Sequence, residues 1–170
     1  MTVSSESWRA SGRAWVFPEP SINTDVVMQR AGHYLPLDRQ RDLVMAAIRP
    51  GWGHLVREGD VLVAGPNFGT GSSRPIVNLL RSLGIVGIVA VSVGEIFFRN
   101  CVSYAMPVLE CSSVLDIVEE GDIVEFDIST GVLLNATNAR SARGAAVPQM
   151  LLETIAAGGT YAQLRAAGYM

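Results

Sequence analysis

Short apolar runs alternate with amphipathic segments through the middle of the chain. Residues 60–65 and 85–91 are apolar over the length of a strand, and a continuous run of this kind is typical of a strand buried on both faces. Residues 76–83 lie between them with apolar positions at helical spacing, and Gly84 is placed to end that helix. A strand, a crossover helix and a second strand in this order predict a parallel, right-handed unit.

The alternation continues toward the C-terminus. A second helix is expected over residues 94–104 with Ile96, Phe97 and Val102 facing inward, and residues 107–110 predict the next strand. Phe97 is thus expected to pack in the core, as are Trp52 and His54.

Outside this unit the pattern changes. Residues 123–128 alternate apolar and acidic side chains, and a Ser-Thr-Gly turn leads them into residues 132–134, so an antiparallel hairpin is expected. Residues 14–17 predict a first strand, ended by Pro18 and Pro20.

Three helices and an exposed loop complete the expected elements. Asp38 can cap a helix over residues 39–48, and the loop before it, residues 29–37, is expected to be exposed. Two short helices are expected over residues 148–157 and 160–167.

These elements predict an α/β fold with a mixed, partly parallel sheet flanked by helices. We expect a single domain over residues 1–170, because a chain of 170 residues that is 49% hydrophobic can bury one substantial core. Residues 1–12, including Trp8, are expected to form a flexible N-terminal tail, and residues 145–170 a C-terminal helical extension.

Charge and composition exclude several classes of protein. The net charge of −3 and the scattered arginines provide no electrostatic footprint for nucleic acid, so no nucleic-acid partner is expected. The polar N-terminus lacks the apolar stretch of a signal peptide, and the apolar run over residues 83–93 is too short to cross a bilayer. We therefore expect a cytoplasmic protein without a membrane partner.

The two cysteines, Cys101 and Cys111, lie in apolar surroundings and lack C-x-x-C spacing. They are expected to be reduced packing residues. Two cysteines cannot ligate an iron–sulfur cluster or a structural zinc, so no metal site is expected in this chain.

The candidate chemistry lies in a glycine-rich turn that follows the strand over residues 60–65. Gly65, Gly69 and Gly71 allow positive φ and close approach of the backbone to a ligand. Ser72 and Ser73 stand where a following helix would begin, with Pro75 in its first turn, and Arg74 adds a guanidinium group. The pattern indicates a site for a carboxylate or a phosphate.

Other known glycine-rich motifs can be compared with this sequence. No lysine follows the last glycine, as a P-loop requires, and the glycine spacing is not that of a dinucleotide fingerprint. A serine-hydrolase elbow lacks its G-x-S-x-G motif, and neither His33 nor His54 is a persuasive base. A tight turn with serines that only cap a helix stays open.

Several motifs in order resemble the small-subunit, or swivelling-domain, branch of the aconitase superfamily, and most of all its isopropylmalate dehydratase small subunits. The resemblance spans roughly residues 12–110 and rests on these segments: Gly12-Arg-Ala-Trp-Val-Phe, Asn23-Thr-Asp25, Tyr34-Leu35, Glu58-Gly-Asp-Val-Leu-Val-Ala-Gly65, Asn67-Phe-Gly-Thr-Gly-Ser-Ser-Arg74, residues 84–92, Ile96-Phe-Phe-Arg-Asn100 and Met106-Pro-Val108.

The resemblance implies a swivelling β/β/α domain and an enzyme that works only with a large subunit. The family's reaction dehydrates and rehydrates a hydroxy-di- or tricarboxylic acid, here isomerising 2-isopropylmalate and 3-isopropylmalate in leucine biosynthesis. It also implies that the large subunit carries a [4Fe-4S] cluster, with no cofactor bound by this chain.

The resemblance assigns roles to individual residues. Ser72 is implied as the base that removes the proton α to a carboxylate, and Asp25 as the aspartate that orients the catalytic groups. The substrate-binding set that it implies is Ser73, Arg74, Gly71, Thr70, Tyr34, Leu35, Pro36 and Leu37. On the residues alone, Asp25 could equally cap its turn.

The chain departs from the family pattern at three places. Pro75 stands where the family has glutamate, and Thr70 where it has cysteine. Pro36 and Leu37 follow the tyrosine–leucine pair where related enzymes often place arginine, and the loop between Asp25 and Tyr34 is about two residues longer than in short family members. An apolar loop favours an apolar substituent on the substrate.

Alternatives therefore remain for the substrate. Arg30, Arg39 and Arg41 are near enough in sequence to pair with a third carboxylate, as a homoaconitate-type substrate requires. A paralogue acting on citramalate or dimethylmalate, and a catalytically silent binding module, also stay open.

Overall fold

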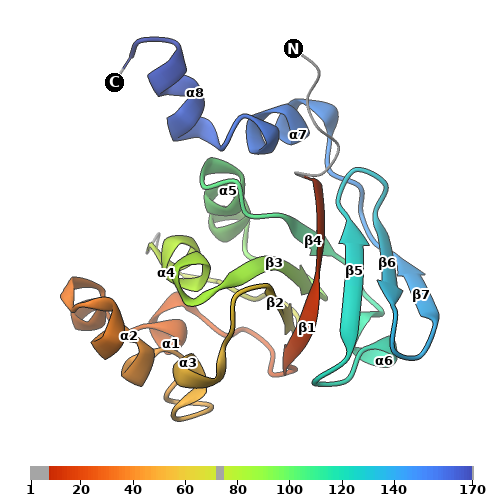
Figure 1. Cartoon of the computed structure of the whole chain (residues 1–170), viewed down its shortest axis with the longest axis horizontal. Helices are drawn as coiled ribbons and strands as arrows, with labels where there is room; N and C mark the ends of the chain where they lie inside the picture. Colours follow the sequence, from red (N-terminus) through yellow and green to blue (C-terminus); the bar gives the residue numbers. More distant parts are fainter. Residues whose placement is uncertain (1–7, 72–74, 170) are drawn as a thin grey trace.

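The computed structural model describes residues 8–71 and 75–169, which build one seven-stranded sheet flanked by helices (Figure 1). The strand order is β4-β3-β2-β1-β5-β6-β7. The strands are β1 (Arg9–Phe17), β2 (Asp60–Ala64), β3 (Ile85–Ala90), β4 (Val108–Glu110), β5 (Ile123–Asp127), β6 (Val132–Asn135) and β7 (Arg140–Arg143).

The helices fall into three groups along the chain. They are α1 (Thr24–Val27), the 3-10 helix η2 (Arg30–Tyr34), α2 (Leu37–Leu43) and α3 (Trp52–Leu55); then α4 (Ile76–Leu83), α5 (Glu95–Ser103) and α6 (Val114–Ile117); and finally α7 (Gln149–Ala156) and α8 (Thr160–Ala166). None of these described helices is both long and apolar enough to cross a bilayer.

Strand β1 joins the two halves of the sheet. Its second half, residues 14–17, pairs in parallel with β2, whereas its first half, residues 9–13, pairs antiparallel with β5. A side chain at Gly12 would place its Cβ 1.8 Å from the backbone oxygen of Gly59, so only glycine allows the chain to pass here. The parallel half, β1 to β4, and the antiparallel half, β5 to β7, thus share one strand (Figure 1).

Two apolar clusters cover the two faces of the parallel strands. Helices α1, α3, α4 and α5 pack on one face, where the largest fully buried side chains include Phe17, Trp52 and Phe97. The other face is closed by β5, β6, α6 and α7. Every residue of β2 is buried, because this central strand has a core on each side.

The expected fold class and most of its elements are confirmed. The parallel pairing of β2 with β3, helix α4 with Gly84 in the left-handed conformation at its end, and the β5–β6 hairpin all lie where the pattern predicts them. Cys101 and Cys111 are buried thiols, and burial raises the pKa of Cys101. The pattern gave no signal for α3, α6 or the edge strand β7.

Four expectations outside the glycine loop were wrong. The helix expected over residues 39–48 ends at Leu43, because Met45 takes a positive φ of 56°. Ile96 is 48% exposed rather than inward. Residues 9–12 belong to β1 instead of a tail, and Trp8 donates a hydrogen bond from Nε1 to the Leu152 oxygen.

The fourth correction concerns His54, which was expected in the core. Its side chain is 52% exposed, and its Nε2 lies 2.7 Å from Oδ1 of Asp42. A short polar contact at the surface therefore satisfies the imidazole, while the neighbouring Trp52 is fully buried as expected.

Candidate active site

The candidate site lies where the parallel strands end. Strands β1, β2 and β3 point the same way and end at Phe17, Ala64 and Ala90, so the loops that follow them share one edge of the sheet. Ligands of open α/β sheets bind at this edge, where loops converge. All the sequence-predicted site residues that the structure describes belong to these loops or to the helices just after them.

The glycine loop after β2 is held between the other two loops. On one side, Gly69 N donates to the Ile22 oxygen at 2.8 Å and Thr24 N donates to the Thr70 oxygen at 2.9 Å. On the other side, Phe68 N donates to the Ser92 oxygen at 3.0 Å and Gly94 N donates to the Phe68 oxygen at 2.8 Å. Backbone hydrogen bonds on both sides therefore fix the loop up to Thr70.

Gly69 is the most constrained point of this loop. Its φ is 74°, and a Cβ there would lie 2.3 Å from Cγ of Phe97. The Phe97 ring packs edge-on against Phe68, with centroids 5.3 Å apart, and both side chains are buried. Gly71 also has a positive φ. Gly65 does not, although positive φ was expected there. Glycine is required at position 65 for a different reason, because a Cβ would lie 2.4 Å from the Pro18 oxygen.

Asp25 is brought next to the end of the glycine loop. A Cβ on Gly71 would lie 3.2 Å from Oγ1 of the buried Thr24, the residue before Asp25. Asn23 caps α1, because its Oδ1 accepts a hydrogen bond from Val26 N at 2.9 Å. The exposed Asp25 lies in the first turn of that helix.

Ser72, Ser73 and Arg74 lie outside the described residues, so their predicted roles stay predictions. Helix α4 begins at Ile76, with Pro75 as its N-cap residue. The expectation that Pro75 lies within the first turn of that helix was therefore wrong by one residue.

The predicted substrate loop forms η2 and the start of α2. Tyr34 is 80% exposed, and Pro36 and Leu37 are exposed as well. Leu35 alone of these four lines a hollow of about 230 Å³ that also contains Asp25. Gln40 holds the loop, because its Nε2 donates to the Leu35 oxygen at 2.7 Å.

Sequence reasoning missed most of the residues that line this hollow. They are Val26, Gln29, Ala31, Gly32, Leu43, Ala46 and Ala47. For Leu43, Ala46 and Ala47 the sequence signal is the apolar character of residues 43–48, which was attributed to a longer helix; Gln29, Ala31 and Gly32 lie in the segment that was expected to be an exposed loop.

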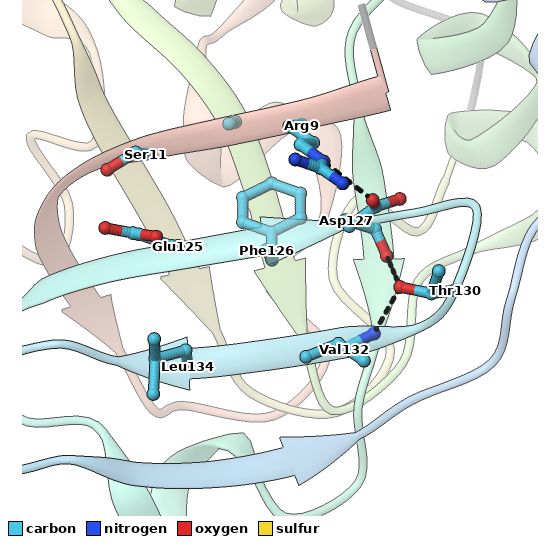
Figure 2. A pocket seen from close by; sticks show the side chains of 9 residues that line it. Arg9, Ser11, Glu125, Phe126, Asp127, Thr130, Val132 and Leu134 are labelled. Atoms are coloured by element: carbon cyan, nitrogen blue, oxygen red, sulfur yellow. Dashed lines mark hydrogen bonds and ion pairs between the residues drawn. The ribbon is translucent and has the colours of Figure 1, made fainter. Parts of the chain in front are cut away.

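A larger hollow, of about 600 Å³, lies on the antiparallel half of the sheet (Figure 2). Strands β1, β5 and β6 line it, with the Arg9–Asp127 ion pair at 2.9 Å and the side chains of Val132 and Leu134. Burial raises the pKa of Asp127, but hydrogen bonds from Ser129 and Arg9 outweigh it and leave the pKa below its ordinary value. None of the predicted site residues lines this hollow, so it is not the candidate active site.

No group of three His, Cys, Asp or Glu side chains placed to hold a metal occurs within residues 8–71 and 75–169. Cys101 lies in α5 and Cys111 follows β4, both buried among apolar side chains. Two thiols in separate apolar clusters do not fit an iron–sulfur cluster, which needs several thiolates around one cavity.

The chain is similar to known proteins over most of its length. The profile of the Aconitase C-terminal domain family matches residues 54–113. The chain is 40% identical to a 3-isopropylmalate dehydratase small subunit of Archaeoglobus fulgidus, over 87% of this chain and 92% of that protein. It is 34% identical to an isopropylmalate/citramalate isomerase small subunit of Methanocaldococcus jannaschii, over 91% of this chain and 92% of that protein.

A solved structure agrees with these sequences. The crystal structure of a 3-isopropylmalate dehydratase from Methanocaldococcus jannaschii has a TM-score of 0.83 to this chain at 28% identity, and the match covers 94% of this chain and 95% of the other. The resemblance noted from the motifs alone is confirmed.

Proposed function

Since this chain belongs to the 3-isopropylmalate dehydratase small-subunit family of the aconitase superfamily, we propose that it is the small subunit of a heteromeric hydro-lyase that interconverts 2-isopropylmalate and 3-isopropylmalate. One observation supports this most: the pairing of Thr24 with Thr70 brings Asp25 against the end of the glycine loop, beside a hollow with apolar walls. The substrate is thus a hydroxy-dicarboxylate with an alkyl substituent. The reaction belongs to leucine biosynthesis, and a cytoplasmic location goes with this proposal.

The large subunit completes the enzyme in this proposal. Relatives of this chain are named small subunits, and its own thiols do not fit a cluster, so the [4Fe-4S] cluster belongs to the partner. When bound, that cluster supplies a Lewis acid for the hydroxyl group of the substrate. The active site then lies between the two chains.

The residues of this chain handle the proton and the carboxylates. Ser72 takes the proton from the carbon next to a carboxylate while the hydroxyl leaves the neighbouring carbon as water, and the reverse addition puts hydroxyl and proton on exchanged carbons. Arg74 pairs with a substrate carboxylate, and Ser73 donates a hydrogen bond to it. A serine is a weak base, so its alkoxide needs nearby positive charge, which Arg74 supplies in this proposal.

Asp25 orients these groups in the proposal. Asn23 already caps α1, so Asp25 is not needed for that structural role. Two backbone hydrogen bonds, at Ile22 and Thr24, join the start of its helix to the glycine loop, and a fixed backbone places the carboxylate reproducibly.

A second candidate function is the isomerisation of citramalate. It is favoured by the relative from Methanocaldococcus jannaschii whose name includes both activities. Citramalate carries a methyl group where isopropylmalate carries isopropyl, and both fit an apolar hollow. A homoaconitate-type substrate is disfavoured, because its third carboxylate would need a cation.

The first test is the Ser72→Ala variant in the complex with the large subunit. Loss of the base is expected to lower kcat on 3-isopropylmalate by about 10²–10⁴-fold while the two subunits still assemble. The matched control is Ser82→Ala in α4, whose hydroxyl donates only to the Asn78 oxygen of its own helix, and it is expected to keep full activity. Unchanged turnover in Ser72→Ala would remove the base role.

The substrate is decided by a panel of substituted malates given to the wild-type complex. Formation of the unsaturated acid from isopropylmalate supports the proposed activity, and turnover of citramalate alone reassigns it to the second candidate. A complex that assembles but is inert on every malate would favour a catalytically silent module.

A further inference from the structure

The hollow beside Asp25 is built by segments that lie far apart in sequence. Its volume is about 230 Å³, and it lies between α1, η2 and the turn that follows α2. Leu35, Leu43, Ala46 and Ala47 are among its apolar lining residues, and Asp25 and Gln29 are its polar ones. In Figure 1, α1 and α2 lie next to each other below α4.

The position of Ala46 and Ala47 is fixed by the backbone. Val44 and Met45 are fully buried, and Met45 takes a positive φ of 56° that turns the chain back. Met45 N donates to the Val27 oxygen at 2.9 Å and so ties this turn to α1. The two alanines are therefore held against the helix that carries Asp25.

The charges around the hollow favour an alkyl group over a carboxylate. No arginine or lysine is among the described residues that line it. Arg41 donates to the Gly53 oxygen at 2.7 Å, and Arg39 forms an ion pair with Asp42 at 3.8 Å. A carboxylate placed there would lose hydration beside Asp25, and none of the described lining residues is a cation that could offset this cost.

The mouth of the hollow presents apolar surface. Leu35 is 40% exposed and Leu43 is 44% exposed, although both are large aliphatic side chains. An alkyl group placed between them would cover apolar surface that now faces water, and burial of that surface is favourable.

From this we propose that Ala46 and Ala47, with Leu43, form the wall that contacts the alkyl substituent of the substrate and sets its largest size. The inference rests on the proposed function and deepens it, because it names residues that choose among substituted malates. Small side chains at positions 46 and 47 leave room for a branched substituent, and Leu43 limits its length.

The test replaces each alanine by leucine in the complex with the large subunit. Isopropyl has two carbons more than methyl, and each methylene in an apolar pocket is worth about 10–200-fold in kcat/KM. Ala46→Leu and Ala47→Leu are therefore expected to lower the ratio of kcat/KM for 3-isopropylmalate over 3-methylmalate by about 10-fold or more. Ala166→Leu, on the exposed face of α8, is the matched control and should leave the ratio unchanged.

A second variant keeps the inference testable if a leucine prevents assembly. Leu43→Ala removes a half-exposed side chain and should fold. It is expected to raise kcat/KM for an isobutyl-substituted malate relative to 3-isopropylmalate.

The outcomes separate the two proposals. Active variants at positions 43, 46 and 47 with wild-type substrate ratios would overturn this inference and leave the proposed function intact. A wild-type complex without activity on any malate would overturn the proposed function, and this inference with it.

Discussion

Asp60, at the start of β2, is a buried carboxylate that joins the first two strands. Its Oδ2 accepts hydrogen bonds from Arg13 Nη2 at 2.8 Å, Trp15 Nε1 at 2.7 Å and the backbone N of Arg57 at 2.9 Å. Burial raises the pKa of Asp60, but these hydrogen bonds and the charge of Arg13 outweigh burial and hold the pKa below its ordinary value. The hydrogen bond to Asp60 also raises the pKa of Arg13.

We expect Asp60→Asn to lower the free energy of unfolding by about 1–3 kcal/mol near neutral pH. The substitution removes the negative charge that pairs with Arg13, and an amide accepts hydrogen bonds from Arg13, Trp15 and Arg57 less well than a carboxylate. The low folded-state pKa gives stabilisation that is present above the unfolded-state pKa of about 3.9 and is lost as the pH falls from there toward the folded-state value. Urea unfolding of both proteins across this pH range should show their difference shrinking on acidification.

The control for this prediction is Asp116→Asn, at an exposed position in α6. Its effect should stay within about 0.5 kcal/mol at every pH. A difference between wild type and Asp60→Asn that does not change with pH would contradict the role given to the Asp60 charge.

At the scale of elements, the glycine loop is held by its neighbours rather than by its own hydrogen bonds. The loops after β1 and β3 bind it from both sides, and Phe97 of α5 packs against Gly69. The sequence predicted the loop and its function from the glycines. It could not predict Phe97 as its support, because the two are 28 positions apart and meet only after α4 and β3 have folded.

Gly69→Ala is expected to be more damaging than an ordinary glycine substitution at positive φ. The left-handed backbone costs an alanine roughly 1–2 kcal/mol, and the added Cβ must also displace the Phe97 ring. The thermal unfolding temperature should fall because of this cost. The kcat/KM of the complex should also fall, because the end of the loop would move relative to Asp25.

Gly121→Ala is the matched control, since its φ is 91° and a Cβ there meets nothing within 4 Å. It should show the backbone cost without the loss of activity. If the two variants are equally stable and equally active, Phe97 does not constrain the loop.

Across the whole molecule, the C-terminal segment completes the second core. Leu152 and Ile155 of α7 are 3% exposed and belong to the apolar cluster that β5 and β6 also enclose. Trp8, just before β1, donates to the Leu152 oxygen at 3.1 Å, so the start of the described chain meets α7 (Figure 1). Helix α7 therefore contributes to the main fold.

We expect Leu152→Ala to lower the free energy of unfolding by about 2–5 kcal/mol, because it opens a cavity in the second core. Met150→Ala, two residues earlier and 75% exposed, should change it by less than about 0.5 kcal/mol. Urea unfolding of the two variants measures the contrast, and similar losses would mean that α7 is not part of the cooperative core.

The sequence by itself determined the α/β class, the parallel unit from β2 to β4 and the β5–β6 hairpin, and it predicted the glycine loop as the chemical centre. Periodicity and glycine spacing are local properties, so they can be read from neighbouring letters. The family also followed from motifs in order along the chain, and it was confirmed.

Tertiary structure alone decided which segments meet. Pairing placed residues 9–13 in the sheet against β5, ended α2 at Leu43, and put Ala46 and Ala47 beside Asp25. A hydrophobic pattern specifies which positions are buried, but not which distant segment buries them, because many pairings bury the same apolar area. The hydrogen bond from Met45 to Val27, and not any local propensity, selects the turn that forms the wall of the hollow.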